Sequence, residues 1–148
     1  MKESSWDECL EFNNALTVTP DRAKAKSLYE TAKERIEFLK GNTLSEKNAS
    51  FVFEGYYSSA LETLHSYVLL KGFNVSNHLC LGYYLRDILK RENLFRIFDD
   101  CRIKRNFLVY YGKKLNFQTA DKDIERIDRL IKEVGLMIEA ELNKVSRV

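Results

Sequence analysis

Residues 119–145 read TADKDIERIDRLIKEVGLMIEAELNKV, and they carry the strongest periodic pattern in the chain. Aliphatic residues recur along this stretch at helical intervals: Ile124, Ile127, Ile131, Val134, Ile138, Leu142 and Val145. The spacing places them on one face of an α-helix, which repeats every 3.6 residues. Thr119 is a suitable N-cap, and Asp121 and Asp123 complement the helix dipole. The stretch therefore predicts a long amphipathic helix packed on a core.

Patterns upstream predict five further helices, at roughly residues 3–14, 20–40, 45–71, 77–90 and 92–114. Thr19 is expected to cap the second of them, with Pro20 at its first position and Gly41 at its end. The connections are short, which favours antiparallel neighbours. The predicted fold class is all-α, an up-down helical bundle without a β-sheet.

The composition is that of one globular domain. Of the 148 residues, 45% are hydrophobic and 31% are charged, as in folded rather than disordered proteins. One proline and six glycines are too few for an all-β protein. We expect residues 1–42 to form an N-terminal helical extension packed on a bundle of residues from about 48 to 148, because the extension is too short to bury a core of its own.

The cysteines and the hydropathy predict a cytoplasmic protein. Cys9, Cys80 and Cys101 are odd in number, far apart and outside any CxxC motif, a pattern typical of free thiols. No apolar run approaches the about 18 residues of a membrane span, and the N-terminal MKESSWDE is no signal peptide. With two histidines and scattered cysteines, we expect no metal site and no cofactor.

The predicted helix at 92–114 has an interrupted apolar stripe. Its apolar members are Leu94, Phe98, Cys101 and Leu108. Arg105 occupies the position that would complete the stripe, and an arginine there needs a partner or a cleft. From Cys101 to Lys114 the chain has five basic residues and no acidic one. The formal net charge is only +2, so this local excess, rather than the total, indicates an anionic ligand.

A second side of the same helix is also apolar, with Ile103, Phe107 and Tyr111. A helix that is apolar on two sides needs two packing partners. One partner is the core of its own bundle. We expect the other to be a second copy of the chain, which makes the protein a homodimer.

Residues 105–112 read RNFLVYYG, and this motif resembles the R-N-x-x-x-H motif of HEPN domains, the higher-eukaryote and prokaryote nucleotide-binding fold. Arg105 and Asn106 match it, whereas Tyr110 stands at the histidine position, similar to a tyrosine-bearing branch of the superfamily. The surroundings are also similar, with GYYSSA at 55–60 in a long helix and Asn-His-Leu at 77–79 opening the next. The resemblance extends from about Asn48 to the C-terminus.

The resemblance implies a four-helix HEPN unit preceded by two additional N-terminal helices. It also implies a metal-independent endoribonuclease or a related RNA- or nucleotide-binding protein, within a toxin–antitoxin or defence module. In active members two copies face each other, and an RNA phosphate is transferred to the neighbouring 2′-hydroxyl. The candidate catalytic residues are then Arg105, Asn106 and Tyr110. The candidate contacts to the nucleic-acid backbone are Arg102, Lys104, Lys113 and Lys114.

Physical chemistry supports these roles unequally. Arginine holds a phosphate bidentately and stabilises developing charge, and an asparagine amide orients it. A tyrosine has an unperturbed pKa of about 10, which makes it a poor base at neutral pH. Tyr110 is therefore better suited to hydrogen bonding or base stacking than to proton transfer.

Two alternatives stay open at this point. The chain is either a non-catalytic partner of a nucleotidyltransferase or a helical adaptor without a nucleic-acid ligand. In the adaptor, Arg105 pairs with a carboxylate such as Asp99 or Glu62. We expect His65 and His78 to serve packing or helix capping. An open cleft at Arg105 favours ligand binding, whereas a buried ion pair favours the adaptor.

Overall fold

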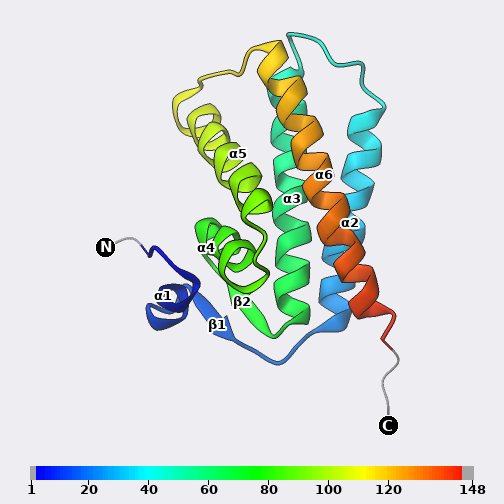
Figure 1. Cartoon of the computed structure of the whole chain (residues 1–148). Helices are drawn as coiled ribbons and strands as arrows, with labels where there is room; N and C mark the ends of the chain where they lie inside the picture. The colour runs from blue at the N-terminus through cyan, green and yellow to red at the C-terminus, as the bar shows by residue number, and fades with distance from the viewer. Residues whose placement is uncertain (1–2, 145–148) are drawn as a thin grey trace.

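A computed structural model describes residues 3–144 and shows a helical bundle (Figure 1). Its helices are α1 (Trp6–Glu11), α2 (Arg22–Lys40), α3 (Ala49–Leu70), α4 (His78–Tyr83), α5 (Glu92–Tyr111) and α6 (Phe117–Leu142). A π-helical turn, η1 (Tyr84–Ile88), continues α4, and two short strands are β1 (Ala15–Thr17) and β2 (Phe73–Val75). The prediction of an all-α bundle is confirmed.

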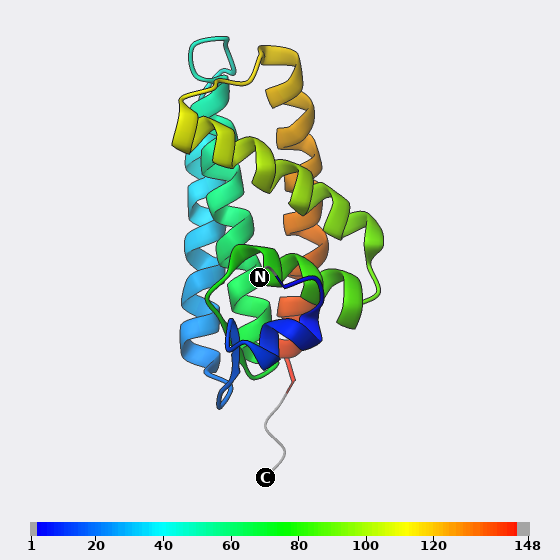
Figure 2. The ribbon, with the colours of Figure 1, turned by 90° about the vertical axis from the view of Figure 1, so that its left-hand side faces the viewer.

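Helix α3 lies at the centre of the molecule. Figures 1 and 2 show α2, α3 and α6 side by side, with α5 crossing this layer at an angle. The sequence of α3 is apolar on most sides, and such a helix is stable only when neighbours surround it. Ser59 and Ser66 donate hydrogen bonds to the carbonyls of Ala32 (3.1 Å) and Ala25 (2.7 Å) on α2. The small side chains thus let α2 approach α3 closely.

The stripe predicted on residues 119–145 forms the inner face of α6. Ile127, Ile131, Val134 and Ile138 are all buried, as predicted. Val145, the last member of the stripe, lies outside the described residues. The helix begins at Phe117 instead of near Thr119, because Asn116 caps it by accepting a hydrogen bond from the Thr119 backbone N–H (2.8 Å).

The start of α2 also differs from the prediction. Its N-cap is Asp21, which accepts a hydrogen bond from the backbone N–H of Lys24 (3.0 Å). Thr19 and Pro20 therefore precede the helix instead of opening it. Asp is at least as good an N-cap as Thr, so Asp21 takes this role two residues after Thr19.

The N-terminal segment departs most from the predicted fold. Helix α1 is only six residues long, because Asn13 adopts a left-handed conformation (φ 61°) that ends it. The chain then forms β1, which pairs antiparallel with β2 in the register Ala15 to Val75. The prediction that the protein has no β-sheet is therefore wrong at this corner.

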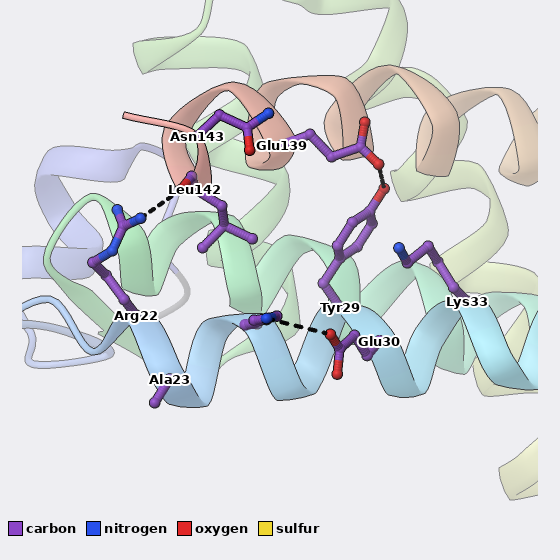
Figure 3. A pocket seen from close by; sticks show the side chains of 9 residues that line it. Arg22, Ala23, Tyr29, Glu30, Lys33, Glu139, Leu142 and Asn143 are labelled. Atoms are coloured by element: carbon purple, nitrogen blue, oxygen red, sulfur yellow. Dashed lines mark hydrogen bonds and ion pairs between the residues drawn. The ribbon is translucent and has the colours of Figure 1, made fainter. Parts of the chain in front are cut away.

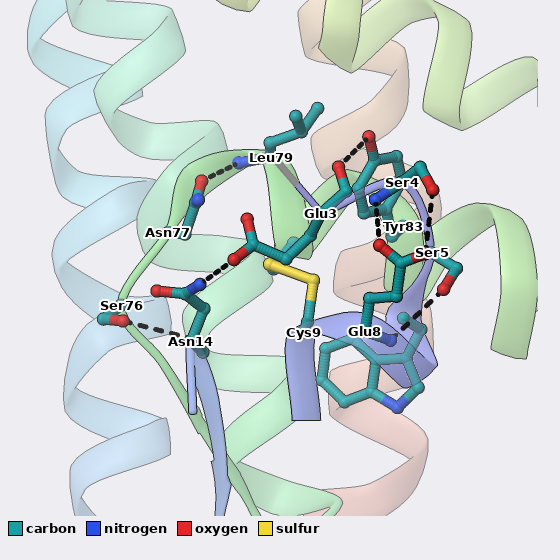
Figure 4. The surroundings of a disulfide bond; sticks show 12 residues. Glu3, Ser4, Ser5, Glu8, Cys9, Asn14, Ser76, Asn77, Leu79 and Tyr83 are labelled. Carbon is teal, nitrogen blue, oxygen red and sulfur yellow. Dashed lines mark hydrogen bonds between the residues drawn. A yellow bond between two sulfur atoms is a disulfide. The ribbon is translucent and has the colours of Figure 1, made fainter. Parts of the chain in front are cut away.

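The pairing of β1 with β2 brings Cys9 and Cys80 together as a disulfide, although 71 positions separate them. Figure 4 shows this bond beneath the N-terminal segment. The prediction of three free thiols is wrong, because distance along the chain says nothing about residues that a strand pairing joins. Cys101 remains a free, buried thiol, and burial raises its pKa to about 12.

Because Cys9 and Cys80 form a disulfide, the cysteines no longer indicate a cytoplasmic location. Within residues 3–144, the structure contains no helix that is both long and apolar enough to cross a membrane.

Candidate functional site

An open hollow of about 420 Å³ lies between the C-terminal half of α5, the start of α4 and the turn that joins α1 to β1. Figure 2 shows α5 crossing the face of the molecule on which α4 and the N-terminal segment also lie. The lining residues are Asn14, Ser76, Asn77, His78, Leu79, Arg102, Arg105, Asn106 and Tyr110. We call this site the Arg105 hollow. It contains the three candidate catalytic residues predicted from the sequence.

The apolar pattern of α5 explains why the hollow forms there. The buried side chains of the helix are Leu94, Ile97, Phe98 and Cys101, all in its first half. Beyond Cys101 the residues of the helix are half-buried or exposed, although Leu108 still packs against the core. Gly112 then ends α5 in a left-handed conformation (φ 62°) that glycine adopts without strain.

Arg105 has no carboxylate partner within residues 3–144. The two partners considered from the sequence are engaged elsewhere, since Asp99 accepts from Arg102 (2.9 Å) and Glu62 pairs with Arg35. The Arg105 Cζ atom instead lies 5.7 Å from the centre of the Tyr57 ring. Its Nε is buried, and no hydrogen-bond partner for it occurs among the described residues. The ion-pair arrangement expected of a helical adaptor is therefore not formed.

Tyr57 forms the inner wall behind Arg105. The ring is 1% exposed and stacks on Phe98 with a centroid distance of 5.8 Å. Burial raises the pKa of Tyr57 well above its ordinary value, although Arg105 and Arg102 act in the opposite direction. The Tyr57 hydroxyl is thus a neutral group, and like Arg105 Nε it has no hydrogen-bond partner among the described residues.

His78 is a member of the hollow that sequence reasoning missed. We expected it to cap α4 or to pack, but Asn77 is the cap, and its Oδ1 accepts from the Leu79 backbone N–H (2.9 Å). The His78 ring centre lies 6.3 Å from that of Tyr57. Burial lowers the pKa of His78, and the positive charges of Arg105 and Arg102 lower it further. No local sequence signal indicates this placement, because only the fold brings α4 to α5.

The other motif residues lie at different depths in the hollow. Asn106 and Arg102 are half-buried in its wall, and Arg102 is held there by Asp99. Tyr110 is 69% exposed and stands at the rim. A side chain with this exposure is free to stack on a ligand base.

Lys104 takes part in an ion-pair network instead of lining the hollow. Its Nζ lies 2.7 Å from Asp123 Oδ2 and 3.0 Å from Asp100 Oδ2, and Arg126 joins both carboxylates. Burial disfavours the charge on Lys104, but the hydrogen bonds to Asp123 and Asp100 outweigh it, so its pKa is raised. Asp100, Cys101 and Asp123 offer ligand atoms within 4.8 Å of one another. Because Lys104 and Arg126 already neutralise these carboxylates, we assign the cluster to the α5–α6 interface.

Lys113 and Lys114 are exposed just after α5 and do not line the hollow. Their ammonium groups lie 5.7 Å from the Phe107 ring and 5.8 Å from the Phe51 ring, respectively. Both lysines therefore lie beside exposed aromatic rings. On α5 the exposed apolar residues Ile103, Phe107 and Tyr111 follow one another at intervals of four, and we call them the α5 apolar surface.

A second opening, of about 410 Å³, lies between α2 and α6 (Figure 3). Arg22 donates hydrogen bonds to the backbone carbonyls of Glu141 (3.0 Å) and Leu142 (2.6 Å). The Tyr29 hydroxyl donates to Glu139 (3.1 Å), and burial together with this carboxylate raises the pKa of Tyr29 to about 12. These groups hydrogen-bond to one another across the two helices, so we assign them to helix packing.

No protein-family model, curated protein or solved structure matches the chain. The HEPN resemblance therefore stays a prediction, and the geometry of the Arg105 hollow carries the functional argument.

Proposed function

We propose that the protein binds the phosphates of RNA or of a nucleotide in the Arg105 hollow. The observation that carries this proposal is the buried Nε of Arg105, which lacks a partner among the described residues beside an open hollow. A buried donor without a partner is costly. A phosphate in the hollow compensates with charge-assisted hydrogen bonds to the guanidinium, which lines the hollow. Since none of the described residues lining the hollow is acidic, no like charge in its wall repels the anion.

The residues around Arg105 suit different parts of a nucleotide. Arg102 adds a second positive charge to the wall, and the Asn106 amide can both donate and accept hydrogen bonds. Tyr110, exposed at the rim, offers a ring on which a base stacks. The site thus combines phosphate and base contacts, as recognition of single-stranded RNA requires.

The α5 apolar surface supports the homodimer that the HEPN resemblance implies. Phe107 and Tyr111 are 46% and 76% exposed, with ring centres 5.8 Å apart. A twofold-symmetric interface uses the same surface on both copies. Because this surface belongs to the same helix as Arg105, such a dimer brings two hollows close together.

A second candidate function is that of a non-catalytic partner of a nucleotidyltransferase, also within a toxin–antitoxin or defence module. Tyr110 favours it, because this residue stands where the common motif has the histidine that transfers protons. In this case nucleotide binding is retained without turnover at the motif.

The test is a titration of fluorescently labelled single-stranded RNA, followed by anisotropy at several low salt concentrations. Arg105→Ala should weaken binding by about 10- to 150-fold, equivalent to about 1.5–3 kcal/mol for a lost charge-assisted contact. The logarithmic salt slope should also fall by about one, because one phosphate fewer is neutralised. Arg96→Ala is the matched control, since Arg96 lies on the same helix with its side chain 75% exposed and outside the hollow.

Equal affinities of the Arg105→Ala and Arg96→Ala variants would contradict the assignment of the site. If the unmodified protein binds neither RNA nor nucleotides at low salt, the adaptor interpretation replaces the proposal.

A further inference from the structure

The HEPN motif has no histidine at position 110 in this chain, but a histidine reaches the same hollow from another helix. His78 is the first residue of α4 and lines the Arg105 hollow. Its ring lies 6.3 Å from Tyr57, and the Arg105 Cζ lies 5.7 Å from the same ring. The imidazole and the guanidinium therefore share one buried neighbour and border one open space.

The surroundings of His78 leave its imidazole available. From α5 it faces Arg102 and Arg105, and from α3 it faces Tyr57 and His65, whose ring lies 6.5 Å away. The N-terminal segment presents Asn14, whose amide is hydrogen-bonded to the Glu3 carboxylate (Figure 4). No hydrogen bond to the His78 ring occurs within residues 3–144.

We propose that His78 is a catalytic residue, the general base that accepts the proton of an RNA 2′-hydroxyl while Arg105 holds the adjacent phosphate. The inference rests on the proposed function, because it needs RNA phosphate in the hollow. It adds turnover to binding and assigns the titratable role to His78 instead of Tyr110.

Cleavage forms one bond to phosphorus and breaks another. The 2′-oxygen loses its proton to His78 and forms a bond to phosphorus, while the bond from phosphorus to the 5′-oxygen breaks. The departing 5′-oxygen takes a proton from solvent water, and the resulting hydroxide takes the proton from His78. The products are a 2′,3′-cyclic phosphate and a 5′-hydroxyl end. Arg105 stabilises the charge that develops on the phosphate oxygens.

The protonation state of His78 fits a base. Burial and the two arginines lower its pKa below the ordinary 6.5, so the neutral imidazole predominates at neutral pH. Only the neutral form accepts a proton. The cleavage rate should therefore rise with pH through a midpoint below 6.5 and then level off. Arg102→Gln removes a positive neighbour and should move this midpoint upward.

The experiment measures two quantities on one short RNA sequence. Cleavage is followed on the unmodified RNA in the presence of EDTA. Binding is followed on the same oligomer with 2′-O-methyl groups, which cannot react. His78→Ala should lower the cleavage rate by about 100-fold or more, the usual contribution of a general base. Its affinity for the 2′-O-methyl RNA should change by less than about threefold.

Two further variants separate catalysis from structure. His65→Gln is the matched control, because His65 is the only other histidine and lines a different, smaller cavity; its cleavage rate should stay within about threefold of the unmodified protein. Added imidazole should restore part of the activity of His78→Ala, which a purely structural role would not allow. If His78→Ala does not fold by circular dichroism, His78→Gln keeps a polar side chain and replaces it in the comparison.

The outcomes distinguish this inference from the proposed function. If the protein binds the 2′-O-methyl RNA but does not cleave RNA, or if His78→Ala and His78→Gln cleave at the unmodified rate, the role of His78 is wrong while binding stands. If the protein binds no RNA at all, both proposals fail. Both proposals are supported if the His78→Ala variant loses cleavage, keeps its affinity for the 2′-O-methyl RNA and regains activity with added imidazole.

Discussion

Helices α5 and α6 differ in how much of their length is buried against the core. α6 keeps one buried face from Ala120 to Ile138, so its whole length serves the core. α5 buries side chains only as far as Cys101, and its second half carries cations, an amide and exposed aromatic rings. The comparison indicates that a helix whose apolar pattern stops before its end has a segment free to bind a ligand or a partner.

The largest effect should come from the buried face of α6. Ile131→Ala should lower the free energy of unfolding by about 2–5 kcal/mol, because the site is 4% exposed and truncation leaves a cavity. Val109→Ala on the second half of α5 truncates a residue that is 43% exposed and outside the α5 apolar surface, and should cost less than about 1 kcal/mol. Urea denaturation measures both. Similar losses for the two variants would remove the distinction between the helices.

A smaller effect should come from the ion-pair network that joins the two helices. Asp123→Asn keeps the side-chain shape but removes the charge that Lys104 and Arg126 share. Since Asp123 is buried while its partners are partly solvated, we expect a loss of about 1–3 kcal/mol in denaturation experiments. Asp121→Asn, at an exposed position of the same helix, is the control. A neutral effect of Asp123→Asn would show that solvent replaces the network.

A substitution on the exposed side of α5 should change self-association and leave the fold intact. Phe107→Glu should weaken self-association by about 30-fold, equivalent to about 2 kcal/mol, because it places a charge in an apolar interface. Phe38→Glu makes the same change on α2, where Phe38 is 74% exposed, and should leave the dimer unchanged. Sedimentation equilibrium is the measurement. A protein that is monomeric at high micromolar concentration would contradict the dimer.

The smallest effect is expected at the rim of the hollow. Tyr110→Phe removes only a hydroxyl and keeps the ring, so RNA affinity should fall by less than about 1 kcal/mol. Tyr110→Ala removes the stacking surface and should cost about 1–3 kcal/mol. Anisotropy titrations distinguish them. An equal loss in both variants would assign the role of Tyr110 to its hydroxyl instead of its ring.

The long helices could be predicted from sequence because their apolar residues repeat with the helical period. Ile127, Ile131 and Val134 are buried as that period requires. The helix starts shifted by two or three residues because Asp21 and Asn116 provide competing caps. The strands could not be predicted, since three residues carry no recognisable period and Cys9 meets Cys80 only through their pairing.

Sequence could predict only those residues of the candidate site that lie on one helix, α5. Arg105, Asn106 and Tyr110 lie on α5, and helical geometry alone brings them near one another. His78 belongs to α4, and nothing in the sequence shows that α4 meets this part of α5. The sequence does not show that Lys104 is neutralised, because its buried partner Asp123 lies 19 positions further along the chain, on α6.

NMR of the arginine Nε–H groups tests most directly whether phosphate binds the Arg105 guanidinium, because a bound anion changes the environment of its Nε–H. The resonance of Arg105 is assigned as the one missing from the Arg105→Lys variant, and the protein is titrated with the 2′-O-methyl RNA. We predict a saturable shift of the Arg105 resonance, with the Arg96 resonance unchanged. Saturation of the protein with RNA while the Arg105 resonance stays in place would contradict the account.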